Sequence, residues 1–483
     1  MAEKPSSIPN SRRDFIKSVG GVTAASALSG VTLPHVFGQE GGSSVQVALV
    51  GCGGRGTGAA AQAMAVKALP TKLVAMADVN EANLNSKADY LQKRANRRPA
   101  DKEKFAVTQD TRFLGFDGYK KAMDALNPGD IVILTSPLAF RWVHFSYAIE
   151  RGLHVFMEKP LTADAPTSRK MLELSEKADA KGLKVGVGLM VRHCRGRQEL
   201  WQRIQDGEIG DIIAMRAYRQ HGPVASAFSK RQPKNQSELL YQINRFHSFL
   251  WASGGLFNDF YIHQIDECCW MKNKWPIKAS AMGGRHYRGV TEKGTPDVYG
   301  DNFVDQNLDT YGVEYTFDDG TKFFFNGRTM FGCQDRESSH VHGSKRSAIV
   351  STSGHTPGKV RIFEGQKQPR RGGTVWEFPQ PEENPYQLEW DDLVEAIRDN
   401  TPYNEVPRGV QASMVGSMGR RAAHTGQEVL YEEFVNDDHE FAPGVDKMTF
   451  ESEAPLKADA NGRYPVPQPG VIKDREYGDP PVA

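Results

Sequence analysis

Apolar runs alternate with helix-forming segments in the first part of the chain. Four runs have the length of a buried strand, at residues 45–50 (VQVALV), 73–77, 130–135 (DIVILT) and 154–157. Segments 57–68 and 139–152 lie between them and have compositions that favour helices. Strands that alternate with helices of this length predict an α/β domain with a doubly wound parallel sheet. The ligand crevice of such a sheet lies at the carboxyl ends of the strands.

The pattern changes after about residue 190. Shorter runs with strand-like composition follow at residues 211–219, 277–285, 309–317, 321–328 and 347–351. Between two of them, Asp318-Asp319-Gly320 is typical of a hairpin turn. Residues 387–398 and 410–424 favour helices. From about residue 436, Pro, Asp and Gly become frequent and periodicity fades, which predicts a loosely ordered arm at 436–483 that could dock on a neighbouring subunit.

The N-terminus has the features of an export signal. Residues 11–17 read SRRDFIK, and a mildly apolar stretch at 18–33 follows, with a plausible small-residue cleavage site at Val36-Phe37-Gly38. This stretch is shorter and more diluted with Gly, Ser and Thr than a membrane-spanning helix, which needs roughly 20 apolar residues. The alternative is a chance arginine pair in a disordered tail. We expect residues 1–44 to be a twin-arginine signal and linker, so that the mature chain is periplasmic and carries no membrane span.

Composition narrows the range of partners. Lys and Arg number 60 and Asp and Glu 59, so the protein has no overall field that attracts nucleic acid or an anionic membrane. About 440 residues remain after the signal, which suggests two domains. The five cysteines contain no C-x-x-C pair, so neither a zinc site nor a redox motif is indicated, and we expect no metal.

A glycine motif follows the first predicted strand directly. Residues 51–56 read GCGGRG and satisfy G-x-G-x-x-G between a strand and a helix. In such a unit the first glycine permits the tight turn, the second lets a pyrophosphate approach the backbone, and the third allows close packing of helix and strand. The motif predicts a dinucleotide site whose cofactor-binding residues include Gly51, Gly53, Gly54, Arg55 and Gly56.

Further cofactor contacts are expected where the other strands end. Asp78 follows the second apolar run, about 22 residues after the motif, where an acidic side chain meets the ribose hydroxyls of NAD. Its alternative role is that of a helix N-cap or turn residue. A carboxylate there repels a 2′-phosphate, so NAD is favoured, with NADP possible. The residues after the later strands should line the same crevice, namely Thr135, Ser136, Pro137, Glu158 and Lys159.

Four features together resemble the Gfo/Idh/MocA family of glucose-fructose oxidoreductase and inositol dehydrogenase. They are GCGGRG after a strand, Asp78 after the next, TSPLAFRWVH, and GLHVFMEKPLT with its E-K-P motif. The resemblance runs from about residue 45 to 434. It implies a Rossmann domain at 45–190 and a substrate and oligomerisation domain at 191–435. The second domain would be α+β with an open, mostly antiparallel sheet, one face lying against the cofactor domain.

The resemblance also implies that helices near residues 387–424 return to the first domain and that the protein is a homo-oligomer, a dimer or tetramer. The segment GGLFNDFYIHQID, residues 254–266, contains Asp259 and His263, which are four residues apart and therefore share one face of a helix. Taken alone, such a pair is an ordinary helix feature. In the family, a Lys of E-K-P and the Asp and His of D-x-x-x-H meet over the nicotinamide, and they match Lys159, Asp259 and His263 here.

The chemistry explains these residue types. Oxidation of a secondary alcohol removes a hydride from carbon and a proton from oxygen, so a base that titrates near neutral pH must touch the hydroxyl. His263 suits that role. Asp259 would orient the imidazole or the substrate, and Lys159 would place positive charge where alkoxide character develops. Four further residues are candidates for substrate binding: Arg192, His193, Arg245 and His247.

These features predict an NAD(P)-dependent oxidoreductase acting on a secondary alcohol of a sugar, cyclitol or related polyol. A tightly bound, recycled cofactor would explain why the chain must fold before export. Two alternatives remain. One is glycosidic bond cleavage through transient oxidation, although relatives with that activity depart from E-K-P. The other is a sugar-binding protein that has lost the chemistry, against which the retained Lys159, Asp259 and His263 argue.

Overall fold

The computed structural model describes residues 44–286, 289–290, 296–297, 302–352, 358–369 and 371–478. The SRRDFIK motif and the apolar stretch at 18–33 lie outside the described residues. Within these ranges, no helix combines the length and the apolar character that crossing a bilayer requires.

The first domain is built on a six-stranded sheet in which all neighbouring strands are parallel, in the order β3-β2-β1-β4-β5-β6. Its strands are β1 (Val45–Val50), β2 (Thr71–Asp78), β3 (Arg112–Leu114), β4 (Ile131–Leu134), β5 (His154–Met157) and β6 (Val185–Val187). The strand order reverses between β1 and β4, which places the ligand crevice beyond their carboxyl ends. The predicted doubly wound sheet is confirmed.

Helices connect these strands: α2 (Gly54–Ala63), α3 (Glu81–Asn96), α4 (Gly118–Asp124), α5 (Arg141–Glu150) and α6 (Ala165–Ala180). Helix α2 begins three residues earlier than the sequence predicts, because the glycine motif itself forms its first turn. The side chain of Asn80 caps α3 by accepting a hydrogen bond from the Asn83 amide, and Asp164 caps α6 in the same way through Thr167.

The second domain contains a nine-stranded sheet in the order β16-β15-β14-β13-β7-β12-β11-β8-β17. Its strands are β7 (Ile212–His221), β8 (Lys278–Gly284), β11 (Thr310–Thr316), β12 (Lys322–Thr329), β13 (Arg336–Gly343), β14 (Ser347–Ser351), β15 (Arg361–Phe363), β16 (Thr374–Glu377) and β17 (Val429–Leu430). Of the neighbouring pairs, β7 and β12 run parallel and the others antiparallel. The predicted mostly antiparallel sheet is therefore confirmed. Strands β9 (Gly289–Val290) and β10 (Pro296–Asp297) form a separate pair.

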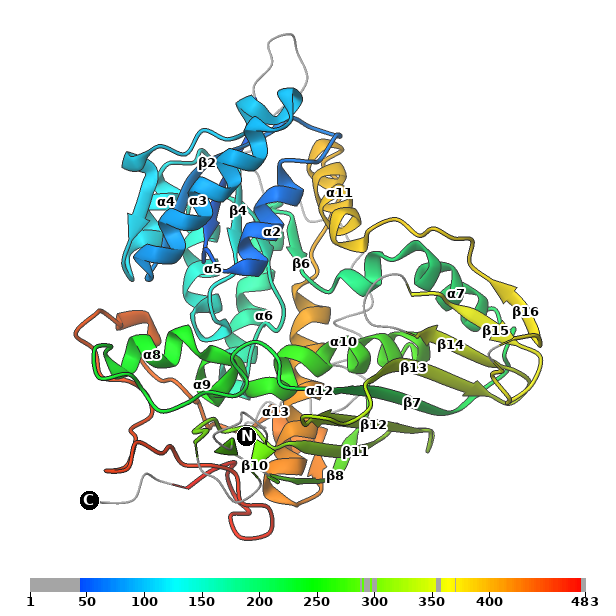
Figure 1. Cartoon of the computed structure of the whole chain (residues 1–483). Helices are drawn as coiled ribbons and strands as arrows, with labels where there is room; N and C mark the ends of the chain where they lie inside the picture. The colour runs from blue at the N-terminus through cyan, green and yellow to red at the C-terminus, as the bar shows by residue number, and fades with distance from the viewer. Residues whose placement is uncertain are drawn as a thin grey trace, which may run out of the picture. The chain divides into compact units, whose positions relative to one another are not determined.

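Two long helices cover one face of this sheet. Helix α10 (Gly255–Lys272) packs on β7 and β13, and α12 (Val406–Thr425) packs on β8 and β11 (Figure 1). Because α12 also contacts α6, helices lie between the large sheet and the first domain. The sheet face turned towards the cofactor domain is therefore covered by these helices.

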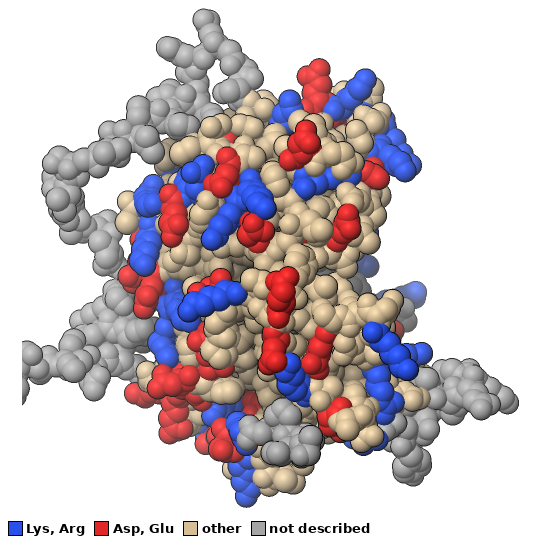
Figure 2. All heavy atoms as spheres, turned by 90° about the vertical axis from the view of Figure 1, so that its left-hand side faces the viewer, with Lys and Arg blue, Asp and Glu red and all other residues tan. Residues whose placement is uncertain are grey.

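Helix α11 (Pro385–Arg398) contacts α2 and β6, so the chain returns to the first domain through α11 and α12. The other α-helices of the described residues are α7 (Arg195–Gln205), α8 (Glu238–Asn244), α9 (Leu250–Ser253) and α13 (Tyr431–Val435). On the face shown in Figure 2, Lys and Arg side chains are interspersed with Asp and Glu, in keeping with the balanced composition.

The C-terminal arm packs against its own chain. Phe441, Leu456 and Tyr464 are buried in one apolar cluster with residues of α8 and α9. In Figure 1 the arm, coloured orange to red, passes beside these helices. The prediction of a loosely ordered arm is therefore wrong for residues 436–478. Its apolar side chains follow no helical or strand period, so the sequence pattern gave no sign of their burial.

Candidate active site

A pocket opens at the carboxyl ends of β1, β2 and β4. It brings together six of the residues predicted from sequence to bind a cofactor: Gly51, Gly53, Asp78, Thr135, Ser136 and Pro137. These residues come from three separate loops, and the parallel sheet places the loops side by side.

The glycine motif fixes the floor of this pocket. Gly51 has a φ of +94°, and a Cβ on it would lie 2.5 Å from the Ser136 nitrogen. A Cβ on Gly56 would lie 2.2 Å from the Gly51 oxygen, which accepts a hydrogen bond of 2.6 Å from the Thr135 hydroxyl. By contrast, a Cβ on Gly53 would meet nothing within 4 Å. The turn is thus closed on one side and open on the other, where a pyrophosphate could approach the N-terminus of α2.

Asp78 stands at the end of β2 and lines the pocket. Its carboxylate accepts hydrogen bonds from the backbone amides of Cys52 at 2.5 Å and Asn80 at 2.8 Å. Burial raises the pKa of Asp78, while these amide bonds act in the opposite direction. Since Asn80 and not Asp78 caps α3, the N-cap alternative does not hold, whereas the turn contact does. The carboxylate ties the glycine turn to β2 at the edge where a ribose would lie.

The outer wall of the pocket comes from the second domain. Ile243, Asn244 and Phe246 line it, and the Asn80 side chain donates to the Asn244 side-chain oxygen at 3.1 Å. A dinucleotide bound here would be enclosed between the two domains of the chain.

The C-terminal arm supports this wall. Gln242 donates a hydrogen bond of 2.8 Å to the Leu456 carbonyl, and the Ala458 amide donates to Glu238 at 2.9 Å. The Tyr241 and Tyr464 rings stack with their centroids 6.4 Å apart. Helix α8 is therefore held in place by residues that lie some 200 positions later in the sequence.

Lys159 and Asp259 meet beside this crevice. The Lys159 ammonium donates to the Asp259 carbonyl at 2.6 Å and lies 3.8 Å from the Oδ1 atom of its carboxylate. The other carboxylate oxygen, Oδ2, lies 3.1 Å from Nε2 of His247, whose Nδ1 is 2.7 Å from the Ser226 hydroxyl. The Asp259 side chain is 13% exposed. The carboxylate is thus shared between an ammonium group and an imidazole.

This environment keeps Asp259 ionised. Burial alone would raise its pKa, but the charges of Lys159 and His247, with the hydrogen bond from His247 and the more distant Arg141, lower it to about 2. Asp259 is therefore an anion throughout the physiological range.

His263 lies one turn after Asp259 on α10 and is buried, with 3% of its surface exposed. The two residues share a helix face, as their spacing predicts. The structure places His247, from the segment before α10, 3.1 Å from the Asp259 carboxylate. His263 thus lies on the helix that carries Asp259, and His247 approaches the carboxylate from outside that helix.

Glu158, the residue before Lys159, forms an ion pair with Arg55 of the glycine motif. The Arg55 Nε atom lies 2.5 Å from Glu158 and its Nη2 atom 3.1 Å from Glu389 of α11, with the guanidinium over the Tyr386 ring at 4.6 Å. Burial, together with the charge of Glu158, raises the pKa of Glu389. Arg55 therefore links the glycine motif to E-K-P and to α11. Gly54 is the first residue of α2. It lines a second groove and not the main pocket.

Arg192 and His193 are engaged in ion pairs. Arg192 makes two hydrogen bonds, of 2.9 and 2.6 Å, to the Asp266 carboxylate. His193 lies 2.6 Å from Asp392 and 3.3 Å from Glu405. Burial lowers the pKa of His193, but these two carboxylates raise it to about 9 overall. Both side chains act here as links between helices.

The other two predicted substrate residues, Arg245 and His247, make different contacts. Arg245 donates to the Ser229 hydroxyl and to the Phe228 carbonyl, both at 2.8 Å, and so shapes a loop. Of the four predicted substrate residues, His247 is the one that contacts the Lys159–Asp259 pair. Sequence reasoning missed Ser226, which holds His247, and Arg141, which donates to the Ser136 carbonyl at 2.9 Å. Arg141 belongs to the TSPLAFRWVH motif, and its place in that motif is the sequence feature that could have identified it as a site residue.

Among the described residues, no group of three His, Cys, Asp or Glu side chains is arranged to hold a metal ion. The cysteines are free, four of them buried (Cys52, Cys194, Cys268 and Cys269) and Cys333 exposed.

Comparison with known families matches both domains. Residues 45–189 match the NAD-binding Rossmann fold of an oxidoreductase family, and residues 202–430 match the C-terminal alpha/beta domain of the same family. The chain belongs to the Gfo/Idh/MocA family. As a Gfo/Idh/MocA protein it has a cofactor domain of the NAD-binding type, and the pocket described above, with its open glycine turn and Asp78, fits that cofactor.

The individual relatives of this Gfo/Idh/MocA protein have low sequence identity with it and match over part of their length. Inositol 2-dehydrogenase of Corynebacterium glutamicum is 26% identical over 144 residues, which are 29% of this chain and 40% of that enzyme. scyllo-Inositol 2-dehydrogenase (NAD+) of Bacillus subtilis is 30% identical over 142 residues, 29% of this chain and 34% of that enzyme. The chain thus matches less than half the length of these relatives.

Among solved structures, that of aldose-aldose oxidoreductase from Caulobacter crescentus, complexed with glycerol, superimposes with a TM-score of 0.58 at 15% identity. The match covers 80% of this chain and 100% of that one. At this level of identity the likeness shows a shared fold.

Proposed function

We propose that this protein is an NAD-dependent oxidoreductase that oxidises or reduces a secondary alcohol of a sugar, cyclitol or related polyol. The observation that carries the proposal is the contact of Lys159 with Asp259, flanked by His247, at the edge of the sheet where the dinucleotide pocket opens. The family assignment and the inositol dehydrogenases among the partial matches support it.

NAD supplies the hydride acceptor in such a reaction. The side chains of this protein would handle the proton and the charge. The Lys159 ammonium would stabilise negative charge on the substrate oxygen as its proton leaves. Asp259, ionised at all working pH values, would hold both Lys159 and an imidazole in place. Two imidazoles are candidates for the base: His263, which the resemblance implies, and His247, which contacts Asp259.

We also propose that the dinucleotide stays bound between turnovers and is recycled by paired oxidation and reduction of two substrates. Helix α8 lines the outer side of the pocket and is held by the arm, which would slow release. The twin-arginine motif supports the same idea, because that route carries folded proteins and would deliver the loaded enzyme to the periplasm, where free NAD is expected to be scarce.

The first test is to denature the purified protein without added nucleotide and to identify the released dinucleotide by mass. About one NAD per chain supports a retained cofactor, and its mass distinguishes NAD from NADP. A protein that carries no dinucleotide, and binds none when it is supplied, contradicts the proposed function. An empty protein that binds NAD readily contradicts only the retention.

The second test uses a panel of sugars and polyols with Lys159→Ala, His263→Ala and His247→Ala. Loss of the ammonium or of the true base should lower turnover by about 10²-fold or more and leave the dinucleotide bound. Lys322→Ala is the matched control, because Lys322 pairs with Glu314 on the large sheet. Normal turnover in all three site variants would refute the assignment. Release of a leaving group with no net change in cofactor redox state would instead favour glycoside cleavage by transient oxidation.

A further inference from the structure

Helix α12 carries a polar stripe on one face. Ser413, Ser417, Arg420 and His424 follow each other at spacings of four, three and four residues, so they align along the helix. All four are buried, with at most 1% of their surface exposed. Buried polar side chains in a helix need partners, and those of this stripe lie in the segments that carry the candidate site.

The stripe contacts the loop that follows Lys159. The Leu161 amide donates to the Ser413 hydroxyl at 3.0 Å. The Ala163 carbonyl accepts from the Ser417 hydroxyl at 3.2 Å and from the Arg420 guanidinium at 2.8 Å. The backbone just beyond Lys159 is therefore fixed to α12 at two points.

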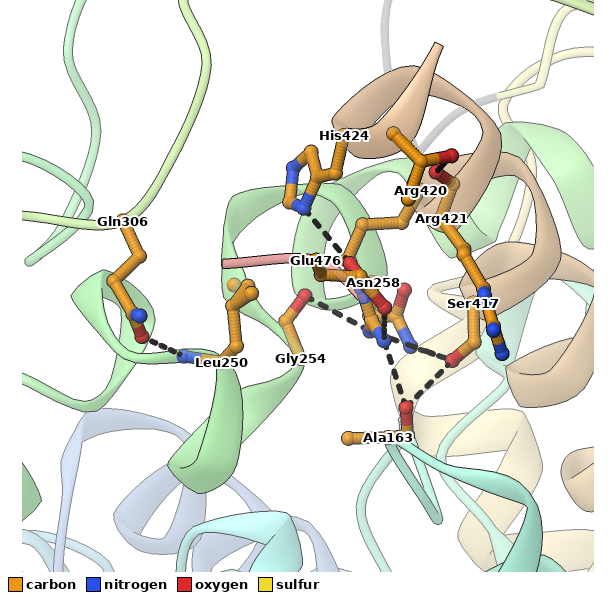
Figure 3. Close-up of polar contacts among 12 residues, drawn as sticks. Ala163, Leu250, Gly254, Asn258, Gln306, Ser417, Arg420, Arg421, His424 and Glu476 are labelled. Atoms are coloured by element: carbon orange, nitrogen blue, oxygen red, sulfur yellow. Dashed lines mark hydrogen bonds and ion pairs between the residues drawn. The ribbon is translucent and has the colours of Figure 1, made fainter. Parts of the chain in front are cut away.

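The same stripe contacts the start of α10. The side-chain nitrogen of Asn258, the residue before Asp259, donates to the Ser417 hydroxyl at 2.7 Å. Arg420 also donates to the Gly254 carbonyl at 3.3 Å. Figure 3 shows these side chains converging from α10, α12 and the loop at Ala163. Ser417 thus bridges the segment that carries Lys159 and the segment that carries Asp259.

A carboxylate from the arm balances the charge of the stripe. Both oxygens of Glu476 accept hydrogen bonds of 2.9 Å from Arg420, and one lies 2.8 Å from Nδ1 of His424. A buried guanidinium without an anion would be strongly unfavourable, so Glu476 holds Arg420 in its position. Glu476 lies outside the matched family domains, which end at residue 430.

We propose that Ser417 and Arg420 are positioning residues that set the separation of Lys159 and Asp259, and that Glu476 fixes Arg420 in that role. This inference rests on the proposed function, in which Lys159 and Asp259 act on the substrate. Ser417 contacts Ala163, four residues after Lys159, and Asn258, the residue before Asp259, so its loss would act on the separation of this pair. Reacting groups displaced by about 1 Å can lose two orders of magnitude in rate, so the bridge matters for turnover.

The test compares Ser417→Ala with Ser175→Ala. Both serines are buried in helices and accept a hydrogen bond from an asparagine side chain, Asn258 at 2.7 Å and Asn404 at 2.9 Å. With myo-inositol as the probe substrate, Ser417→Ala should lower kcat about tenfold, with KM and bound NAD unchanged. Ser175→Ala should behave as the wild type, and Ser417→Thr, which keeps the hydroxyl, should restore most of kcat.

Crystal structures of the variants provide a readout that needs no turnover. Ser417→Ala and Glu476→Gln should lengthen the distance of 3.8 Å between Lys159 and Asp259, whereas Ser175→Ala should preserve it. If the distance is unchanged and kcat of Ser417→Ala equals that of Ser175→Ala, the inference is wrong. If Lys159→Ala also turns over normally, the proposed function fails as well. If Lys159→Ala loses activity while Ser417→Ala behaves as Ser175→Ala does, the positioning role is wrong and the proposed function stands.

Discussion

The Nε2 atom of His247 lies 3.1 Å from the Oδ2 atom of Asp259, while the Lys159 ammonium stands 3.8 Å from Oδ1 of the same carboxylate. Each oxygen of one anion thus faces a different nitrogen group. Since this environment lowers the pKa of Asp259 to about 2, protonation of Asp259 cannot account for any change of activity near neutral pH.

The pH dependence of turnover follows from this. We expect Asp259→Asn to lower kcat about 10²-fold at every pH from about 5 to 9, because it removes an anion that is present throughout that range. Turnover should fall furthest in whichever of His247→Gln and His263→Gln removes the base. An Asp259→Asn profile with normal turnover above neutral pH would contradict the expectation. Values of kcat for the two histidine variants decide between the imidazoles, and the profile of Asp259→Asn tests the carboxylate.

Stability should also depend on this carboxylate. Because the folded-state pKa of Asp259 lies below its ordinary value, the ionised form stabilises the fold above about pH 4, and this contribution is lost as pH falls towards 2. The shift corresponds to about 2 kcal/mol. Asp259→Asn should therefore reduce the free energy of unfolding by about that amount at pH 7 and by less in acid. Urea unfolding at several pH values measures both, and an equal loss at all pH values would contradict the assignment.

The glycine motif offers a clean pair of substitutions. Gly56→Ala places a methyl group against the Gly51 carbonyl at 2.2 Å and should destabilise the fold by about 1–3 kcal/mol. Gly53→Ala meets no atom within 4 Å and should leave stability unchanged, but its methyl group lies in the pocket and should weaken NAD binding about tenfold. Thermal unfolding and NAD titration separate the two effects. Wild-type affinity in Gly53→Ala would move the dinucleotide away from this turn.

Asp78 should set the preference for NAD. Replacement of Asp78 by Ser removes the charge that repels a 2′-phosphate, so the ratio of NADP to NAD affinity should rise by about 10- to 100-fold. The exposed Asp117→Ser variant is the control. Dissociation constants for both dinucleotides give the result. A ratio that does not move in Asp78→Ser would show that the ribose lies elsewhere.

The arm should control dinucleotide release. Tyr464→Leu removes the ring that stacks on Tyr241 and should loosen α8, so that bound NAD dissociates about tenfold faster in a chase with excess competitor. Tyr431→Leu, which changes a tyrosine on α13, serves as the control. Equal release rates in both variants and the wild type would mean that the arm does not restrain the pocket.

Local pattern predicted the strands that are buried on both sides. Strands β1 and β5 have the bounds that their apolar runs indicate, because a parallel strand buried on both faces has a nearly continuous apolar sequence. Strand β13, RESSHVHG, went unpredicted because its residues are mostly polar. Its strand geometry comes from pairing with β7 and β14 on either side, which a single segment of sequence does not reveal.

The candidate site also has parts that local sequence predicted and parts that it did not. The positions of Lys159 and Asp259 came from short motifs, whereas the contact of His247 with Asp259 depends on the turn before α10, where Gly254 has a φ of +70°. Arg192 was expected to bind substrate, yet its partner Asp266 is 74 residues away in sequence, and no local pattern indicates such a pairing. Long-range ion pairs therefore decided which candidates face the crevice.

The support of α8 by the arm has a consequence for biosynthesis. Residues 44–246, which contain every side chain lining the dinucleotide pocket, leave the ribosome well before Leu456, Tyr464 and Glu476. A nascent chain can therefore form the Rossmann sheet early, as N-terminal domains generally do. It cannot secure the outer wall or the junction of α10 and α12 until translation is almost complete. The outer wall of the pocket is thus the part of the site that translation completes last.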